Sequence, residues 1–166
     1  MQLSGLLSLV HDIPAYAALR RHIEKGSIPP ALGINHAARP FLAAALADDL
    51  QRPTLILTAR TEQAHQLSDT LRAWLPQPAR VRLFAEPDAL PYERVAWSRE
   101  TRQQRLSALV ALTQTPGAAA SAGPAPVIVA SARALALLTL PRRELILALR
   151  PLRRGQMTEM TGLIEK

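Results

Sequence analysis

Three short apolar runs, separated by longer amphipathic stretches, constrain the fold of this chain more than any other feature of its sequence. The runs are TLILT at 54–58, VRLF at 81–84 and VIVA at 127–130. Short runs without polar alternation are typical of strands that are buried on both faces of a parallel sheet. Helical segments between such strands predict βαβ units with right-handed crossovers. We therefore expect an α/β fold of three layers, in which a parallel sheet has helices on both faces.

Helical periodicity and punctuation residues place the remaining elements. Pro40 suits the first turn of a helix over 41–50, and Thr61 is expected to cap the next helix. In the helix expected near 99–114, the buried side is predicted to carry Leu106, Leu109, Val110 and Thr113. The run ELILAL is predicted to form a fourth strand. The expected helices cover 15–25, 41–50, 61–75, 99–114 and about 131–138, and the fourth strand covers 144–149.

Composition along the chain predicts its organisation. Residues 1–30 are expected to form N-terminal helices, and residues 31–150 the α/β domain. The segment TPGAAASAGPAP, at 115–126, has no core-forming residue and is predicted to be a flexible, low-complexity insertion. Residues 151–166 begin a new helix at Thr158, which predicts a lead-out toward a following subdomain.

Several classes of chemistry find no candidate residues in this sequence. The chain has no cysteine, which excludes disulfides, thiol nucleophiles and cysteine-based metal sites. Its four histidines lack metal-ligand spacing, and no serine lies in a G-x-S-x-G turn. We therefore predict no metal and no catalytic residue. No apolar run reaches the ~20 residues of a membrane span, so we predict a cytoplasmic protein without a membrane partner.

The net charge of +7 comes almost entirely from arginine. A basic surface favours phosphate backbones and acidic partners. Arginine-rich, alanine-rich and lysine-poor usage that is spread along a chain often reflects genome composition instead. The charge alone therefore leaves both interpretations open.

The turn GINHAARP, which begins at Gly33, resembles a phosphate loop that has lost its key residues. In the pattern G-x-x-x-x-G-K-[ST], Gly33 fits the first glycine, while Ala38, Arg39 and Pro40 replace the second glycine, the lysine and the hydroxyl residue. A Cβ at Ala38 restricts positive φ. Pro40 offers neither an oxygen for Mg²⁺ nor an N–H for an anion. We therefore interpret Gly33, Ala38 and Arg39 as a vestigial cofactor-binding loop that is inactive, with no cofactor bound.

Aromatic, proline and basic residues gather in the stretch EPDALPYERVAWSRETRQQRL, from Glu86 to Leu106. In one interpretation, arginines grip nucleic acid while aromatic rings stack on bases. In the other, Tyr92 and Trp97 close the edge of the sheet and the arginines face water. The candidate nucleic-acid residues are Arg94, Arg99, Arg102, Arg105, Tyr92 and Trp97, of which Arg99, Arg102 and Arg105 are expected to form one stripe of a helix.

Four blocks of the sequence, taken together, are similar to the N-terminal module of Mfd, the bacterial transcription-repair coupling factor family, whose first subdomain resembles domain 1a of the repair helicase UvrB. The block with the most specific spacing has Leu90-Pro91-Tyr92-Glu93, with Arg105-Leu106 thirteen residues beyond Tyr92. The family usually has tryptophan where this chain has Pro87 or Asp88. The four blocks are ALGINHAARPFLAAALADDL, RPTLILTARTEQAHQLSDTLRAWL, FAEPDALPYERVAWSRETRQQRLSALVAL, and VIVASARAL followed by LRRGQ.

The resemblance implies a degenerate P-loop NTPase-like, UvrB-like fold and a non-catalytic scaffold role in transcription-coupled nucleotide excision repair. It further implies that UvrA binds the adjoining subdomain. The ATP- and Mg-dependent DNA translocase and the region that binds RNA polymerase lie in later domains of the family. Two alternatives from the residues themselves stay open, which are a standalone phosphate-loop nucleotide-binding enzyme and a basic nucleic-acid-binding module.

Overall fold

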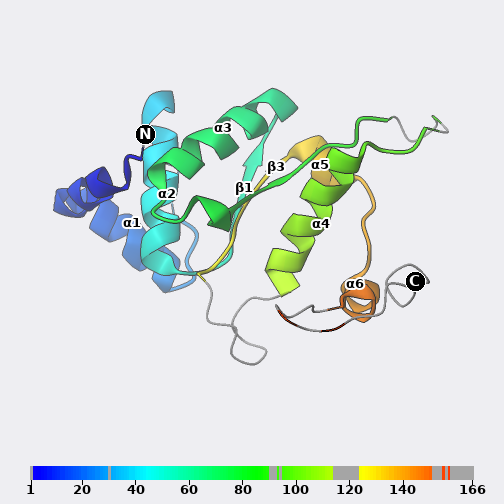
Figure 1. Ribbon diagram of the computed structural model, residues 1–166. Coiled ribbons are helices and arrows are strands. Elements are labelled where there is room, and N and C mark those ends of the chain that lie inside the picture. Colours follow the sequence, from blue (N-terminus) through cyan, green and yellow to red (C-terminus); the bar gives the residue numbers. More distant parts are fainter. Residues whose placement is uncertain are drawn as a thin grey trace.

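The computed structural model describes residues 2–29, 31–89, 93, 95–113, 124–150, 155 and 157 (Figure 1). Within these ranges the chain alternates helices with three strands. In chain order the elements are η1 (Ser4–Asp12), α1 (Pro14–Glu24), η2 (His36–Ala38), α2 (Arg39–Leu50), β1 (Thr54–Thr58), α3 (Thr61–Trp74), η3 (Pro78–Arg80), β2 (Val81–Phe84), α4 (Arg99–Thr113), β3 (Val127–Ser131), α5 (Ala132–Ala136) and α6 (Arg142–Ala148). Most of the insertion predicted at 115–126 and nearly all of the lead-out predicted at 151–166 lie outside the described residues.

The three strands form one parallel sheet in the order β1-β3-β2. Val127 of β3 lies in register with Thr54 of β1 on one side and with Val81 of β2 on the other. Both neighbours of β3 are parallel to it, as the βαβ pattern predicts. The expectation of a mixed α/β fold with a parallel sheet is confirmed.

Successive residues of β3 pack against different helices because strand side chains alternate between the two faces of a sheet. Val127 and Val129 belong to a core cluster with η1, α2 and α3. Ile128 and Ala130 belong to a second cluster that includes Phe84 of β2, Ala108 of α4 and Ala134 of α5. All five residues of β3 are buried. Helices therefore cover both faces of the sheet, with α2 and α3 on one side and α4 and α5 on the other (Figure 1).

The outer strand β1 corrects the expectation that its run is buried on both faces. Leu55 and Leu57 are 57% and 55% exposed, although they lie in register with buried residues of β3. The reason is the strand order, which places β1 at one edge of the sheet, whereas α4 packs over β2 at the opposite edge. One face of β1 thus stays open among the described residues.

The predicted fourth strand at 144–149 is wrong, because this segment forms the helix α6. Pro141 precedes the first helical residue with an extended backbone, and Glu144 lies in the first turn, where a carboxylate stabilises a helix. Leu145 is buried while Leu147 is 76% exposed. A short apolar run cannot be assigned to strand or helix by periodicity alone, and here the proline decides.

The buried side of α4 also differs from the prediction. Leu106 is 42% exposed, whereas Thr101, Arg105 and Ala108 are buried. These three residues follow helical spacing and are smaller or more polar than the leucines. The small side chain of Ala108 allows α4 to approach the sheet closely. Of the predicted apolar residues, Leu109 packs against the core cluster that contains Ala108 and Ile128.

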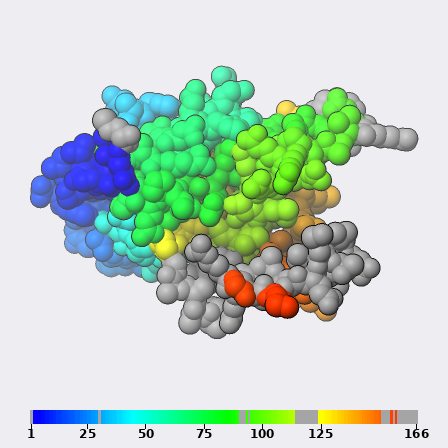
Figure 2. All heavy atoms as spheres, viewed as in Figure 1, coloured from blue at the N-terminus to red at the C-terminus, as the bar shows by residue number. Residues whose placement is uncertain are grey.

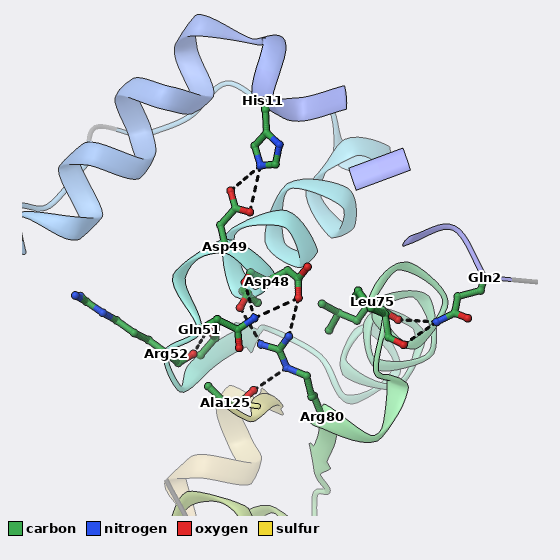
Figure 3. Close-up of polar contacts among 12 residues, drawn as sticks. Gln2, His11, Asp48, Asp49, Gln51, Arg52, Leu75, Arg80 and Ala125 are labelled. Carbon is green, nitrogen blue, oxygen red and sulfur yellow. Dashed lines mark hydrogen bonds and ion pairs between the residues drawn. The ribbon is translucent and has the colours of Figure 1, made fainter. Parts of the chain in front are cut away.

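The amino-terminal segment is attached to the α/β layers by main-chain and side-chain contacts. The N–H of Leu3 donates to the carbonyl of Ala73 at 2.8 Å. Gln2 Nε2 donates to the carbonyls of Leu75 and Pro76, and Gln2 and Leu75 are labelled in Figure 3. Leu7, Val10 and Tyr16 belong to the same core cluster as the sheet. Residues from the predicted N-terminal helices and from the α/β domain thus share one core.

Two adjacent aspartates at the end of α2 bind different parts of the chain (Figure 3). Asp49 accepts hydrogen bonds from the Tyr16 hydroxyl at 2.6 Å and lies 2.9 Å from His11 Nε2. Burial and this hydrogen bond raise the pKa of Tyr16 above its usual value. Asp48 accepts from Arg80 Nη1 at 2.8 Å.

Arg80 joins three segments at the end of the sheet where the strands begin. Its Nε donates to the carbonyl of Ala125 at 2.9 Å, just before β3, and its Nη2 donates to the carbonyl of Ala47 at 2.9 Å, in α2. The residue is only 5% exposed. A guanidinium fork can serve several acceptors at once, so Arg80 fixes α2 relative to the starts of β2 and β3.

Candidate functional site

The carboxyl ends of the three strands are where a parallel α/β sheet binds ligands, because loops and helix N-termini converge there. Thr61 follows β1, Glu86 follows β2, and Ser131 ends β3. The strand order brings these three residues together although they are far apart in sequence. With Arg133 of α5 they form a polar group that we call the Glu86 cluster.

Both carboxylate oxygens of Glu86 are engaged in this cluster. Oε2 accepts hydrogen bonds from the Thr61 hydroxyl and, at 3.3 Å, from the Ser131 hydroxyl. Oε1 forms an ion pair with Arg133 Nε at 3.0 Å. The Glu86 side chain is 14% exposed, whereas that of Arg133 is 62% exposed. The cluster therefore connects the ends of all three strands through one carboxylate.

Two helix starts depend on this arrangement. Ser131 caps α5, since its Oγ accepts the N–H of Ala134 at 3.1 Å. Thr61 was predicted to cap α3, but the N-cap residue is Arg60 and Thr61 is already helical. The Thr61 hydroxyl instead donates to the carboxylate of Glu86, because Glu86 follows the end of β2 and lies directly beside Thr61.

The Glu86 cluster joins the ends of the strands through hydrogen bonds and one ion pair. It contains no histidine that could relay a proton from a serine. Within the described ranges, no group of three or more His, Asp or Glu side chains gathers to hold a metal ion. A carboxylate with both oxygens already paired is suited to joining elements.

The vestigial loop lies at the start of α2. Gly33 has room for a Cβ, and its φ is outside the left-handed region, so glycine is not required there. The Asn35 side chain accepts the N–H of Ala37 at 3.1 Å, which uses a donor that a phosphate would need. Pro40 lies in the first turn of α2, as predicted.

The chain that enters this loop also differs from a working phosphate loop. Such a loop connects a strand to a helix. In residues 27–29 and 31–35 the structure has no strand. Ala38 and Arg39 have right-handed backbone conformations. At this helix start the N–H groups of Ala38 and Arg39 donate to the carbonyls of Asn35 and His36.

The basic stretch after β2 is built around a buried arginine. Arg105 is 3% exposed, and its guanidinium carbon lies 4.0 Å from the Phe84 ring centroid and 5.3 Å from that of Trp97. Nη1 donates to the carbonyls of Ala85 at 2.8 Å and Ala134 at 3.3 Å, while Nη2 has no hydrogen-bond partner. Burial lowers the pKa of Arg105.

This position corrects the predicted stripe of three surface arginines. Arg105 faces the sheet and cannot contact a phosphate at the surface, whereas Arg99 and Arg102 are exposed. Trp97 lies against the Arg105 guanidinium, and the prediction that this ring closes the edge of the sheet stays a prediction. Tyr92 and Arg94 lie outside the described residues.

The turn before α4 is ordered by Asp88. Its two carboxylate oxygens each accept the N–H of Ser98 at 3.1 Å. The Ser98 hydroxyl in turn accepts the N–H of Thr101 at 3.2 Å and so caps α4. The hydrogen bond from Ser98, helped by the nearby charge of Arg102, lowers the pKa of Asp88.

Sequence reasoning missed Glu86, Ser131, Arg133 and Arg80. Each is polar and lies within a few residues of a strand end. For Glu86, Ser131 and Arg133, the position just after or at the end of a predicted strand was the signal that could have marked them as site residues. Nothing in the sequence distinguishes Arg80 from the other arginines.

The fold and the site define a small α/β protein with a three-stranded parallel sheet and a self-contained polar cluster at the carboxyl ends of its strands. Among the described residues, no helix is long and apolar enough to cross a membrane. No protein-family model matches the chain, and no curated protein matches it.

Proposed function

We propose that this chain is a non-catalytic, UvrB-like module of a transcription-repair coupling factor, with a degenerate P-loop NTPase-like fold. In this role it is a cytoplasmic interaction and regulatory scaffold for transcription-coupled nucleotide excision repair. UvrA would bind the subdomain that adjoins it. RNA polymerase, DNA and ATP with Mg would be bound by other domains of the same protein.

The start of α2 is the observation that carries the proposal. The residues that correspond to the phosphate loop offer an unstrained Gly33, an Asn35 side chain that occupies a backbone donor, and Pro40 in the first helical turn. An anion site needs free N–H groups at a helix start. These features support a module in which this loop does not hold a nucleotide.

The order of the sequence blocks that resemble the Mfd family supports the same proposal. TLILT forms β1, VRLF forms β2 and VIVAS forms β3, all parallel in one sheet. The Glu86 cluster occupies the place where a ligand would bind, and its carboxylate is paired with side chains of the chain itself. Both features suit a domain that has kept its architecture and lost its chemistry.

Titration calorimetry with Mg-ATP, alongside a phosphate-release assay, tests the absence of chemistry. We expect no heat of binding and no release above background. Release that disappears in Arg39→Ala would overturn the proposal and favour a phosphate-loop enzyme. Arg52→Ala, at an exposed arginine just beyond the C-terminal end of α2, is the matched control.

The family role is tested separately by the gene. We expect the reading frame to continue past codon 166 into a subdomain that binds UvrA and a helicase-type motor. A stop codon at that position would contradict the role in transcription-coupled repair.

A further inference from the structure

The strand β2 has an open edge. In the order β1-β3-β2 it is an outer strand, and within the part of the chain that the structure describes it pairs only with β3. An outer strand directs a row of unpaired N–H and C=O groups away from the sheet. Such an edge can accept a further strand from another chain.

A groove follows this edge. Val81, Arg82 and Leu83 all line one hollow of about 300 Å³. Consecutive strand residues point to opposite faces, so a hollow that touches all three runs along the edge of the strand. Arg72 of α3 lies on one side of it and α4 on the other. In Figure 2 the green surface of α3 and β2 meets the yellow-green surface of α4.

A wider hollow of about 730 Å³ continues the groove along α4. The two hollows share Arg82, Gln103 and Ser107. The wider one has a basic end and an apolar end on the same helix. It is lined by Arg82, Arg99, Arg102, Gln103, Leu106, Ser107, Val110 and Ala111.

The groove is strongly basic. Arg82, Arg99 and Arg102 line it, and none of the described residues that line the wider hollow carries a carboxylate. Arg72, in the narrower hollow, is paired with Asp69 at 2.8 Å, and Glu100 accepts a hydrogen bond from Gln104 at 3.0 Å. Positive charge therefore dominates beside the open strand, and it would attract an acidic segment.

We propose that the edge of β2 binds an extended acidic segment of a partner protein by strand addition. The main chain of the segment would pair with the free N–H and C=O groups of β2. Arg82 lies in register with Ile128 and therefore points to the α4 face. Alternate side chains of the added strand would point to the same face, so acidic residues at every second position would meet Arg82, Arg99 and Arg102.

The lining favours a peptide over a nucleic acid. A strand edge presents carbonyl oxygens as well as N–H groups, and a peptide backbone complements both, whereas phosphates complement only the donors. Among the residues that the structure describes, no aromatic side chain lines either hollow to stack on a base. Leu106, Val110 and Ala111 instead offer apolar contact. The inference rests on this geometry and does not depend on the family role proposed above.

The probe is a fluorescent peptide of about ten residues in which glutamate alternates with valine and threonine, as a strand requires. Anisotropy should show binding to the full chain, and hydrogen exchange should show new protection of β2 amides. A peptide with lysine for glutamate should not bind. A peptide with alternate N-methylated residues keeps its charge but loses main-chain donors, so it should bind much more weakly.

Variants of the chain locate the site. Arg82→Glu and Arg102→Glu should each weaken binding at least about tenfold, because like charges across an interface repel. Arg82→Lys keeps the positive charge and should retain most of the affinity. It also provides a folded variant for comparison if Arg82→Glu unfolds the chain. Arg52→Glu, an exposed arginine away from the groove, should leave binding unchanged.

Three results would overturn the proposal. The N-methylated peptide could bind as well as the parent, which would reduce the interaction to charge alone. The acidic peptide could fail to bind while a single-stranded DNA oligonucleotide binds in an Arg82- and Arg102-dependent way. Arg82→Ser could self-associate while no peptide binds. Arg82 would then serve only to prevent the edge of β2 from pairing with another copy of the chain.

Discussion

Arg80 offers the sharpest test of how this fold is held together. We consider Arg80→Met, which keeps the apolar stem of the side chain and removes the guanidinium. The change deletes the hydrogen bonds to the carbonyls of Ala47 and Ala125 and the ion pair with Asp48. Arg80 is 5% exposed, and Asp48 is about one-third exposed.

The expected loss follows from what the substitution leaves behind. Breaking a buried ion pair by removing one partner costs about 3–5 kcal/mol. Water can reach Asp48 because its side chain is 32% exposed, so we expect the lower end of this range. A loss of ~3 kcal/mol is a large share of the ~5–15 kcal/mol by which most domains are stable. At ~2–4 °C per kcal/mol for a chain of this size, Tm should fall by roughly 6–12 °C.

Urea unfolding, followed by circular dichroism, measures the change in free energy. Arg80→Lys should recover only part of it, because a single ammonium cannot reproduce the fork. Arg52→Met, at an exposed arginine, should stay within ~0.5 kcal/mol of the parent chain. If Arg80→Met loses less than ~1 kcal/mol, the size of an ordinary hydrogen bond, the assigned role of Arg80 is refuted.

Three further predictions concern the residues after β2. Glu86→Ala should cost about 2–3 kcal/mol in urea unfolding, because it leaves the two hydroxyls of the cluster without their acceptor, and Glu86→Gln should cost less; equal losses would contradict this account. Trp97→Ala should cost about 1–2 kcal/mol because it uncovers the Arg105 guanidinium, and Trp97→Phe should restore most of the stability, whereas no loss would place the ring elsewhere. Folding lowers the pKa of Asp88 below its usual value of 3.8, so its carboxylate should stabilise the fold fully above pH 3.8 and lose this effect as the pH falls through the lower folded-state pKa. The difference in unfolding free energy between the parent chain and Asp88→Asn should therefore shrink in acid. A difference that stays constant with pH would exclude this role.

Local sequence patterns predicted most of the fold because strands and helices here follow their own periodicity. TLILT and VRLF form strands at the expected residues, and α2 begins near Pro40 as proposed. Two further errors, at β1 and at Arg105, arose where tertiary context decides. Leu55 is exposed because β1 lies at an edge of the sheet. Arg105 is buried because its guanidinium packs against two aromatic rings and donates hydrogen bonds to two carbonyls.

The candidate site was harder to predict because its residues meet only after the strands are ordered. Thr61, Glu86 and Ser131 follow three different strands, and their contacts depend on β3 lying in the middle of the sheet. No local spacing encodes that order. The vestigial loop stays a prediction, which rests on local features of the sequence such as Pro40.

The central place of β3 has a consequence for synthesis on the ribosome. Neither β1 nor β2 has a strand partner within the described residues until β3 appears, since the two outer strands do not touch each other. Thr54 can pair only after Val127 has been synthesised. At a translation rate of about 5–20 residues per second, this interval lasts roughly 4–15 s. During that time two apolar strands have edges free on both sides. A chaperone bound to the nascent chain would have its greatest effect in this window, and it would be released when β3 closes the sheet.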